Sequence, residues 1–209
     1  MVDDDERAPS PEEMLRVIEE QSHATVRLLQ GDPRLLYVPW GVSWLLGFAA
    51  LFLHYGLDGR SYLPISQMQA VSVLMGAMIV AGAVSAYGIV KMNKSVRGDT
   101  SARGAMYGYA WLAGMVLASL IAIRLGPMLP AAERGLLWAG GPLLVVALLY
   151  MLGGAIWLNW PMFFIGGWTA GVNALGVLLG PGPHALLTAV LLGGGFIAAG
   201  LWLWRRQRG

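Results

Sequence analysis

Six stretches of this chain are long and apolar enough to cross a lipid bilayer as helices. A membrane-spanning helix needs about 20 mostly apolar residues, because the hydrocarbon layer offers no partner to an unpaired backbone group. The predicted spans are residues 38–57, 68–90, 105–125, 135–157, 162–179 and 183–204. The fifth is the shortest and the richest in glycine. The pattern therefore predicts an all-α fold, a polytopic integral membrane bundle of six transmembrane helices.

Composition supports this class of protein. Of the 209 residues, 56% are hydrophobic and 12% are charged, against about a quarter charged in soluble domains. Nine of the twelve carboxylates lie within the first 32 residues, so an acidic, disordered segment (1–9) is expected before the helices. A basic tail (205–209) follows the bundle (38–204). The absence of cysteine excludes disulfides, thiolate metal sites and cysteine nucleophiles.

The positions of lysine and arginine predict the orientation in the membrane. Basic loops stay in the cytoplasm. With six spans and a cytoplasmic N-terminus, eleven of the fourteen basic residues fall on the cytoplasmic side, and only Arg60, Arg124 and Arg134 fall outside. Removing the fifth span would place the Arg205 cluster outside. The charge pattern therefore favours six spans with both termini cytoplasmic.

Residues 10–31 predict a cytoplasmic amphipathic helix. Ser10 is a suitable N-cap, Pro11 suits the first helical position, and Glu13 completes a capping box. Apolar side chains, among them Met14, Ile18, Leu28 and Leu29, fall on one half of the helical wheel. The other half is net acidic, which suits anionic lipid poorly. The apolar stripe is therefore expected to dock on protein: the underside of the bundle as a structural lid, a second copy, or a separate cytoplasmic subunit.

The loop at 91–104 carries four basic residues, including Lys91, Lys94 and Arg97. Anchoring of the topology by contact with lipid phosphates is its ordinary use. Contact with a cytoplasmic partner is the more specific alternative. The loop lacks the interleaved aromatic residues typical of nucleic-acid binding, so no nucleic-acid partner is expected.

The glycines of the fifth span do not form a nucleotide-binding loop. Gly166, Gly167 and Gly171 fail the G-x-G-x-x-G spacing, and no Walker A lysine follows any glycine run. Small residues four apart instead let membrane helices approach closely. The predicted packing positions are Ala77, Ala81, Ser85, Ala110, Gly114, Ala118, Gly166, Gly167, Ala170, Gly171 and Ala174. Such faces can pack within one subunit or between subunits. We expect the protein to form a homo-oligomer.

The spans carry little candidate chemistry. None contains aspartate, glutamate or lysine, so ion-coupled antiport through a buried carboxylate is not expected. Asn173 and Thr169 are the polar residues of the fifth span, with interhelical hydrogen bonding as their default use. His54 and His184 are both expected near the outer face, where satisfied interfacial histidines are the ordinary interpretation and a metal or haem site the weaker alternative. No catalytic constellation is found, so we expect no enzyme activity and no cofactor.

An amphipathic cytoplasmic helix followed by six spans resembles half of a small ABC-type exporter permease. In that family such a helix and the first inner loop touch the ATPase subunit. The resemblance implies a transport component, of the bacterial cell (inner) membrane, that works with a separate cytoplasmic ATPase. The alternative interpretation is a non-transporting membrane scaffold, sensor or accessory protein whose amphipathic helix folds onto its own bundle.

Overall fold

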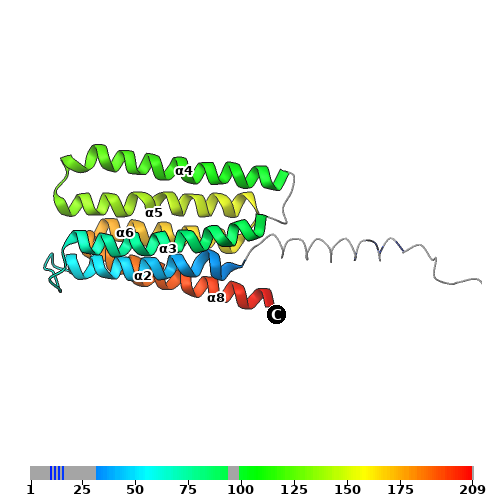
Figure 1. Ribbon diagram of the computed structural model, residues 1–209, viewed down its shortest axis with the longest axis horizontal. Coiled ribbons are helices and arrows are strands. Elements are labelled where there is room, and N and C mark those ends of the chain that lie inside the picture. Colours follow the sequence, from blue (N-terminus) through cyan, green and yellow to red (C-terminus); the bar gives the residue numbers. More distant parts are fainter. Residues whose placement is uncertain are drawn as a thin grey trace, which may run out of the picture.

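Six long apolar helices run side by side in the computed structural model, and the residues it describes form no strand (Figure 1). The description covers residues 10, 12, 14, 16, 32–93 and 99–208, with the side chains of 92, 93 and 99–101 left out. Each of the six helices is long and apolar enough to cross a membrane. The all-α bundle and its six predicted spans are therefore confirmed, and the chain is a multi-pass membrane protein.

The helices follow one another as α2 (Pro33–Tyr55), α3 (Gln67–Asn93), α4 (Asp99–Leu125), α5 (Ala131–Ile156) and α6 (Trp160–Leu179). A short 3-10 turn, η2 (Gly126–Met128), links α4 to α5. The sixth span has three parts: α7 (Pro181–Leu187), a π-helical segment η3 (Thr188–Gly193) and α8 (Gly194–Arg208). It is one continuous span, 28 residues long.

The first span begins five residues before its predicted start, at Pro33. Asp32 is its N-cap: a carboxylate oxygen accepts from the backbone N–H of Arg34 at 2.9 Å, and the Arg34 side chain forms a further ion pair with it at 2.7 Å. The hydrogen bond from Arg34 is the main reason that the pKa of the Asp32 carboxyl lies below its usual value. Asp32 and Pro33 therefore start α2.

The core of the bundle is centred on α2. This helix packs against α3 on one side and against α7, η3 and α8 on the other. Its Trp44, Phe48 and Leu51 belong to one buried cluster with Leu143 of α5 and Phe196 of α8. α5 and α6 form a second closely packed pair. The polar centre described below lies where these two groups of helices meet.

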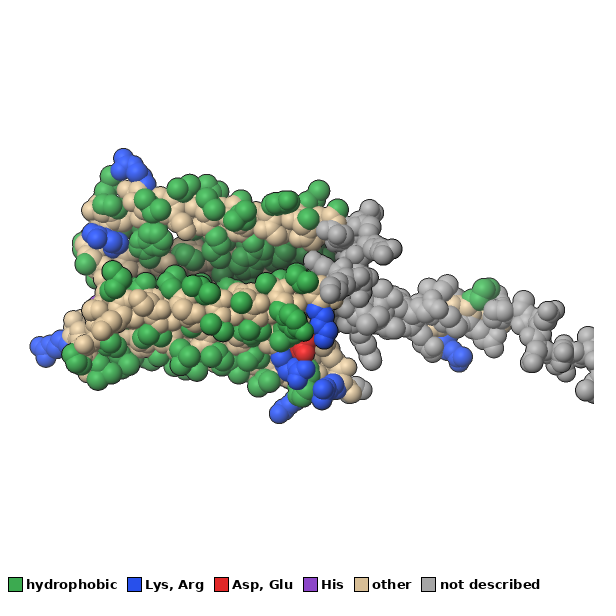
Figure 2. All heavy atoms as spheres, viewed as in Figure 1, with side chains coloured by type: hydrophobic (Ala, Val, Ile, Leu, Met, Phe, Trp, Pro, Cys, Tyr) green, Lys and Arg blue, Asp and Glu red, His purple; other side chains and the backbone are tan. Residues whose placement is uncertain are grey.

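α4 lies at the edge of the bundle, and among the described elements its close contacts are with α5 and the η2 turn (Figure 1). Although α3 and α4 follow one another in sequence, they do not pack closely, and Figure 2 shows a hollow between them with apolar side chains on both walls. Apolar side chains cover the length of the bundle, and the basic side chains gather at its two ends (Figure 2). This distribution fits a helical bundle surrounded by lipid.

Candidate functional site

The most polar point inside the bundle is a hydrogen-bonded chain from His184 through Asn173 to the backbone of α5. His184 Nε2 lies 2.9 Å from Asn173 Oδ1, and Asn173 Nδ2 donates to the carbonyl oxygen of Gly140 at 3.0 Å. His184 is 1% exposed and Asn173 6% exposed. The chain joins α7, α6 and α5, and both side chains lie within segments long and apolar enough to span the membrane. We call these three groups the polar centre.

The hydrogen bonds define which ring nitrogen of His184 carries a proton. The carbonyl of Gly140 can only accept, so the Asn173 amide nitrogen must face it. The Asn173 oxygen is then left to accept from His184, which requires a proton on Nε2. In the neutral imidazole Nδ1 is therefore a free acceptor, and no described residue donates a hydrogen bond to it. A bound donor, or a second proton, could use this position.

Glycines make room for the polar centre. A Cβ atom at Gly176, one turn after Asn173, would lie 2.7 Å from Cδ2 of His184 and 3.0 Å from its Cα. A Cβ at Gly140 would lie 3.5 Å from Oδ1 of Asn173. The turn that brings His184 back toward α6 depends on Gly180, whose φ of +98° favours glycine. The glycine-rich sequence thus lets three backbones meet around two polar side chains.

The π-helical segment η3 follows α7 directly and begins one turn after His184. A π-helix inside an α-helix is rare and is frequently found at functional sites. Thr188, at its first position, is fully buried, and neither its hydroxyl nor that of the buried Ser43 on α2 has a hydrogen-bond partner among the described residues. A buried hydroxyl without a partner is costly in an apolar bundle.

Trp168 stabilises the backbone of η3. Its indole Nε1 donates to the carbonyl oxygen of Leu191 at 3.1 Å. Gly195 allows this approach, since a Cβ there would lie 3.3 Å from Nε1. Irregular helix within a membrane is tolerated where a neighbouring helix satisfies the freed carbonyl groups. Thr169, next to Trp168, is fully buried, but its hydroxyl donates only to Ile165 of its own helix, at 2.8 Å.

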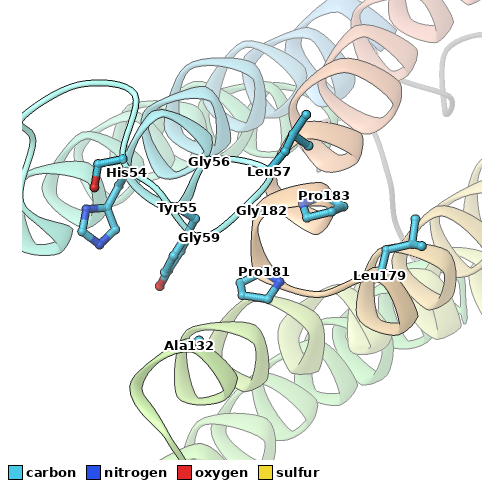
Figure 3. A pocket seen from close by; sticks show the side chains of 11 residues that line it. His54, Tyr55, Gly56, Leu57, Gly59, Ala132, Leu179, Pro181, Gly182 and Pro183 are labelled. Atoms are coloured by element: carbon cyan, nitrogen blue, oxygen red, sulfur yellow. The ribbon is translucent and has the colours of Figure 1, made fainter.

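A pocket of about 350 Å³ lies at the end of the bundle beside α7 (Figure 3). Tyr55 of α2, Ala132 of α5 and Pro181 of α7 stand around it, and His54 lies at its edge. His54 Nδ1 lies 2.8 Å from the carbonyl oxygen of Ile65, so Nδ1 must carry the proton. The other residues that line the pocket are mostly glycines and apolar side chains.

His54 and His184, the two histidines considered as a metal or haem site, have different surroundings in the structure. His54 lines the end pocket and bonds to a backbone carbonyl, whereas His184 does not line that pocket and bonds to Asn173. Within the described part of the chain, no three histidine, aspartate or glutamate side chains gather as a metal site would require. His184 lies near the end of the bundle that carries His54, but it is enclosed rather than interfacial.

Several predicted packing positions lie at helix contacts. Ala81 and Ser85 of α3 are buried, and the Ser85 hydroxyl accepts from Trp40 Nε1 at 2.9 Å and donates to the Leu35 carbonyl at 3.1 Å. A Cβ at Gly114 would lie 2.7 Å from Val145 of α5. These contacts fasten α3 to α2 and α4 to α5.

α6 packs closely on α5 through one of the several small-residue faces that its sequence contains. A Cβ at Gly166 would lie 2.6 Å from the backbone nitrogen of Met151. A Cβ at Gly167 or Gly171 would meet nothing within 4 Å. Of the other predicted positions, Ala77, Ala118 and Ala170 are half-buried, and Ala110 and Ala174 are exposed.

Other close contacts were missed by sequence reasoning. Gly41 of α2 and Gly193 of η3 face one another: a Cβ at Gly41 would lie 2.7 Å from the Gly193 carbonyl oxygen. Gly154 of α5 similarly lies against the backbone of Phe163. Gly41 stands alone in the first span, without a second small residue four positions away, so the spacing rule gave no signal for it.

The predicted partner-binding residues fall mostly outside the described part of the chain. This applies to Ile18, Leu28, Leu29, Lys94 and Arg97, and to most of the predicted cytoplasmic amphipathic helix. Met14 is described and exposed, and its N–H donates to the carbonyl of Ser10 at 2.9 Å. Lys91, at the end of α3, is exposed.

Comparison with known proteins adds no assignment. The chain matches no protein-family model, and searches of the curated proteins and of the solved structures give no significant match. Its function must therefore be argued from the bundle and its polar centre alone.

Proposed function

We propose that the protein is a transport component: a permease-like subunit of the bacterial cell (inner) membrane, with both termini cytoplasmic. The observation that carries this proposal is the polar centre, where His184 and Asn173 are buried in an apolar bundle. Polar side chains enclosed among apolar membrane helices are expensive, and they commonly line substrate pathways. In this role the chain binds and passes a solute and catalyses no reaction itself.

The sixth span supports the same role. Transporter folds commonly place their substrate site where a membrane helix is interrupted, because the interruption exposes backbone groups and lets helix segments move. Here the irregular segment is η3, which begins one turn after His184 with Thr188, whose hydroxyl is unpaired among the described residues. The free Nδ1 of His184 and this hydroxyl are the groups that would receive a polar solute once the helices part.

The energy for transport would come from a separate cytoplasmic ATPase. The spans carry no carboxylate in their apolar interior: among the described residues Glu133 lies in the first turn of α5, and Asp58 lies outside the helices. A carrier without a buried carboxylate lacks the usual group for coupling to protons or sodium. The predicted amphipathic helix, with Met14 and Ile18 on its apolar stripe, and the Lys91 loop would contact that subunit.

We further propose that two copies work together, with α4 at the contact between them. α4 packs on a single neighbouring helix and exposes most of its apolar surface. Because the chain has no cysteine, Ala110→Cys gives a single thiol on the exposed face of α4. Oxidation in native membranes should produce a covalent dimer, and Leu144→Cys on an exposed position of α5 should not. Equal cross-linking of both variants would reject α4 as the contact.

Co-purification tests the transport proposal. The full chain, purified in mild detergent from its native host, is expected to retain an ATPase and to stimulate its ATP hydrolysis in proteoliposomes. His184→Leu should keep the ATPase bound but reduce that stimulation. Thr169→Val is the matched control, because the Thr169 hydroxyl bonds only within its own helix. A wild-type protein that retains no ATPase would overturn the proposal.

One observation favours the alternative role as a non-transporting scaffold, sensor or accessory protein. The polar centre is closed, with His184 and Thr188 almost wholly buried. A bundle that never opens would keep them so. Purification alone, as a tight oligomer whose His184 stays inaccessible to diethyl pyrocarbonate in membranes, would favour that role. Modification of His184 during ATP turnover would favour transport.

A further inference from the structure

We propose that the groove between α6 and α8, at the end of the bundle that carries Arg206, binds one anionic phospholipid, with the phosphate at Arg206 and an acyl chain between the helices. The groove has a volume of about 360 Å³, within the range of about 300–1,000 Å³ that is usual for small-molecule sites. It lies apart from the polar centre, and none of the residues named there lines it.

The groove exists because α6 and α8 separate toward this end. α6 is held against the sixth span at η3, through the bond from Trp168 to Leu191, but it does not pack closely on α8. Ala199 of α8 keeps the wall low where a larger side chain would close the gap. The opening therefore lies along two membrane helices, where lipid chains have access.

The walls of the groove are apolar and largely aromatic. Trp160 and Phe164 of α6 are one turn apart and stack, with ring centroids 5.6 Å apart and planes 29° apart. They are 67% and 65% exposed, so both rings face the surroundings of the bundle rather than its core. Trp202 forms the opposite wall on α8. Tryptophans at a helix end are typical of the level of the lipid headgroups, so the groove begins at that level and runs into the acyl-chain region.

One cation stands at the polar end of the groove. The Arg206 guanidinium lies 4.3 Å from the centre of the Trp202 ring, a cation–π contact that holds it beside the opening. No carboxylate among the described side chains pairs with Arg206, and Asp32, at the same end of the bundle, is bound to Arg34. Arg205 and Arg208 add to the positive field. An apolar groove ending in an unpaired, pre-positioned guanidinium matches an acyl chain joined to a phosphate.

Native mass spectrometry of the purified full chain tests the proposal with two lipids of identical acyl chains, phosphatidylglycerol and phosphatidylcholine. One phosphatidylglycerol should bind about fivefold more tightly than phosphatidylcholine, the effect of one basic charge near an anionic headgroup. Arg206→Gln should abolish this preference. Arg205→Gln is the matched control: it removes the same charge from the neighbouring position, which does not line the groove, and should keep the preference.

Ala199→Phe provides a test that does not change the charge. Filling the groove should weaken binding of both lipids while leaving the melting temperature within a few degrees of wild type. If Arg206→Gln fails to fold, the binding of both lipids to Ala199→Phe and the lipid preference of the wild type still test the proposal. The proposal is overturned if the preference survives in Arg206→Gln or is lost equally in Arg205→Gln. Displacement of the lipid by inorganic phosphate, or a protein segment cross-linked into the groove, would likewise overturn it.

Discussion

Replacing Asn173 by alanine should destabilise the bundle through two lost hydrogen bonds. Asn173 bonds to His184 on α7 and to the Gly140 carbonyl on α5. Interhelical hydrogen bonds in membranes average about 0.6 kcal/mol, so the two together should contribute about 1.2 kcal/mol. The variant also leaves the Nε2–H of His184 buried and unpaired, which raises the expected loss toward 3 kcal/mol. We therefore expect Asn173→Ala to cost about 1–3 kcal/mol.

A double-mutant cycle isolates the bond between the two side chains. Unfolding free energies are measured by steric trapping in bicelles for wild type, Asn173→Ala, His184→Leu and the double variant. The coupling energy should lie between about 0.6 and 1.7 kcal/mol, the average and the maximum found for such pairs. Thr169→Val, whose hydroxyl bonds only to Ile165 of its own helix, should cost less than about 0.6 kcal/mol. A coupling energy near zero in folded variants would refute the interpretation of the pair as a joint between α6 and α7.

Three further predictions concern the remaining contacts. Gly166→Val should lower the free energy of unfolding by about 1–3 kcal/mol in the same assay, because its Cβ would meet the Met151 backbone at 2.6 Å. Gly167→Val meets open space, so its free energy of unfolding should lie within about 0.5 kcal/mol of wild type. Equal losses in the two variants would contradict the packing register of α6. Trp168→Phe, which loses the bond to Leu191, should cost about 0.6–1.7 kcal/mol and increase hydrogen exchange in η3, and unchanged exchange would argue against the indole as its support. Asp32→Ala should lower the free energy of unfolding by about 1 kcal/mol at neutral pH, because it removes the N-cap of α2. Since the pKa of Asp32 is lowered in the folded protein, the difference in melting temperature between variant and wild type should shrink as the pH falls below about 4. A difference independent of pH would exclude the carboxylate as the cap.

The six spans could be predicted from sequence because the membrane imposes a single requirement. Every backbone group in the hydrocarbon layer must bond within its own helix, so each crossing leaves an uninterrupted apolar stretch in the sequence. The ends of the spans were less certain. Pro33 follows Asp32 in a pair that can close one helix or open the next, and only the contact between Asp32 and the Arg34 backbone distinguishes the two.

The packing register of α6 could not be predicted because its sequence satisfies the rule on several faces at once. Gly166 begins one series of small residues four apart, and Gly167 begins another. The spacing says that backbones can approach, but the partner helix decides which face is used. Here α5 presents the backbone of Met151 to Gly166, and Gly167 is left with open space. Contacts between single glycines, such as Gly41 with Gly193, leave no periodic signal at all.

The pairing of His184 with Asn173 was beyond sequence reasoning for a different reason. Each residue was singled out separately, Asn173 as a buried polar group and His184 as a residue near the outer face. Their meeting depends on the tight turn at Gly180, which reverses the chain between α6 and α7 and sets the two side chains 2.9 Å apart. A sequence places residues along a span, whereas the rotation of one helix about its axis relative to the next comes from packing.

The π-helical segment explains how one span can keep a single face buried over its whole length. His184, Thr188, Leu192, Phe196 and Gly200 are all buried and are spaced four residues apart. In a regular α-helix, at 3.6 residues per turn, His184 and Phe196 would be roughly 120° apart around the axis. The wider turn of η3 holds more residues per turn and removes part of this rotation. The ring centroid of Phe196 therefore lies 4.6 Å from that of Trp44 on α2. At the same time the His184 ring lies 6.1 Å from the Phe48 ring of the same helix, centroid to centroid, and still bonds to Asn173. Regularising η3 would force one of these contacts to be given up, so the irregular helix and the polar centre are parts of one arrangement.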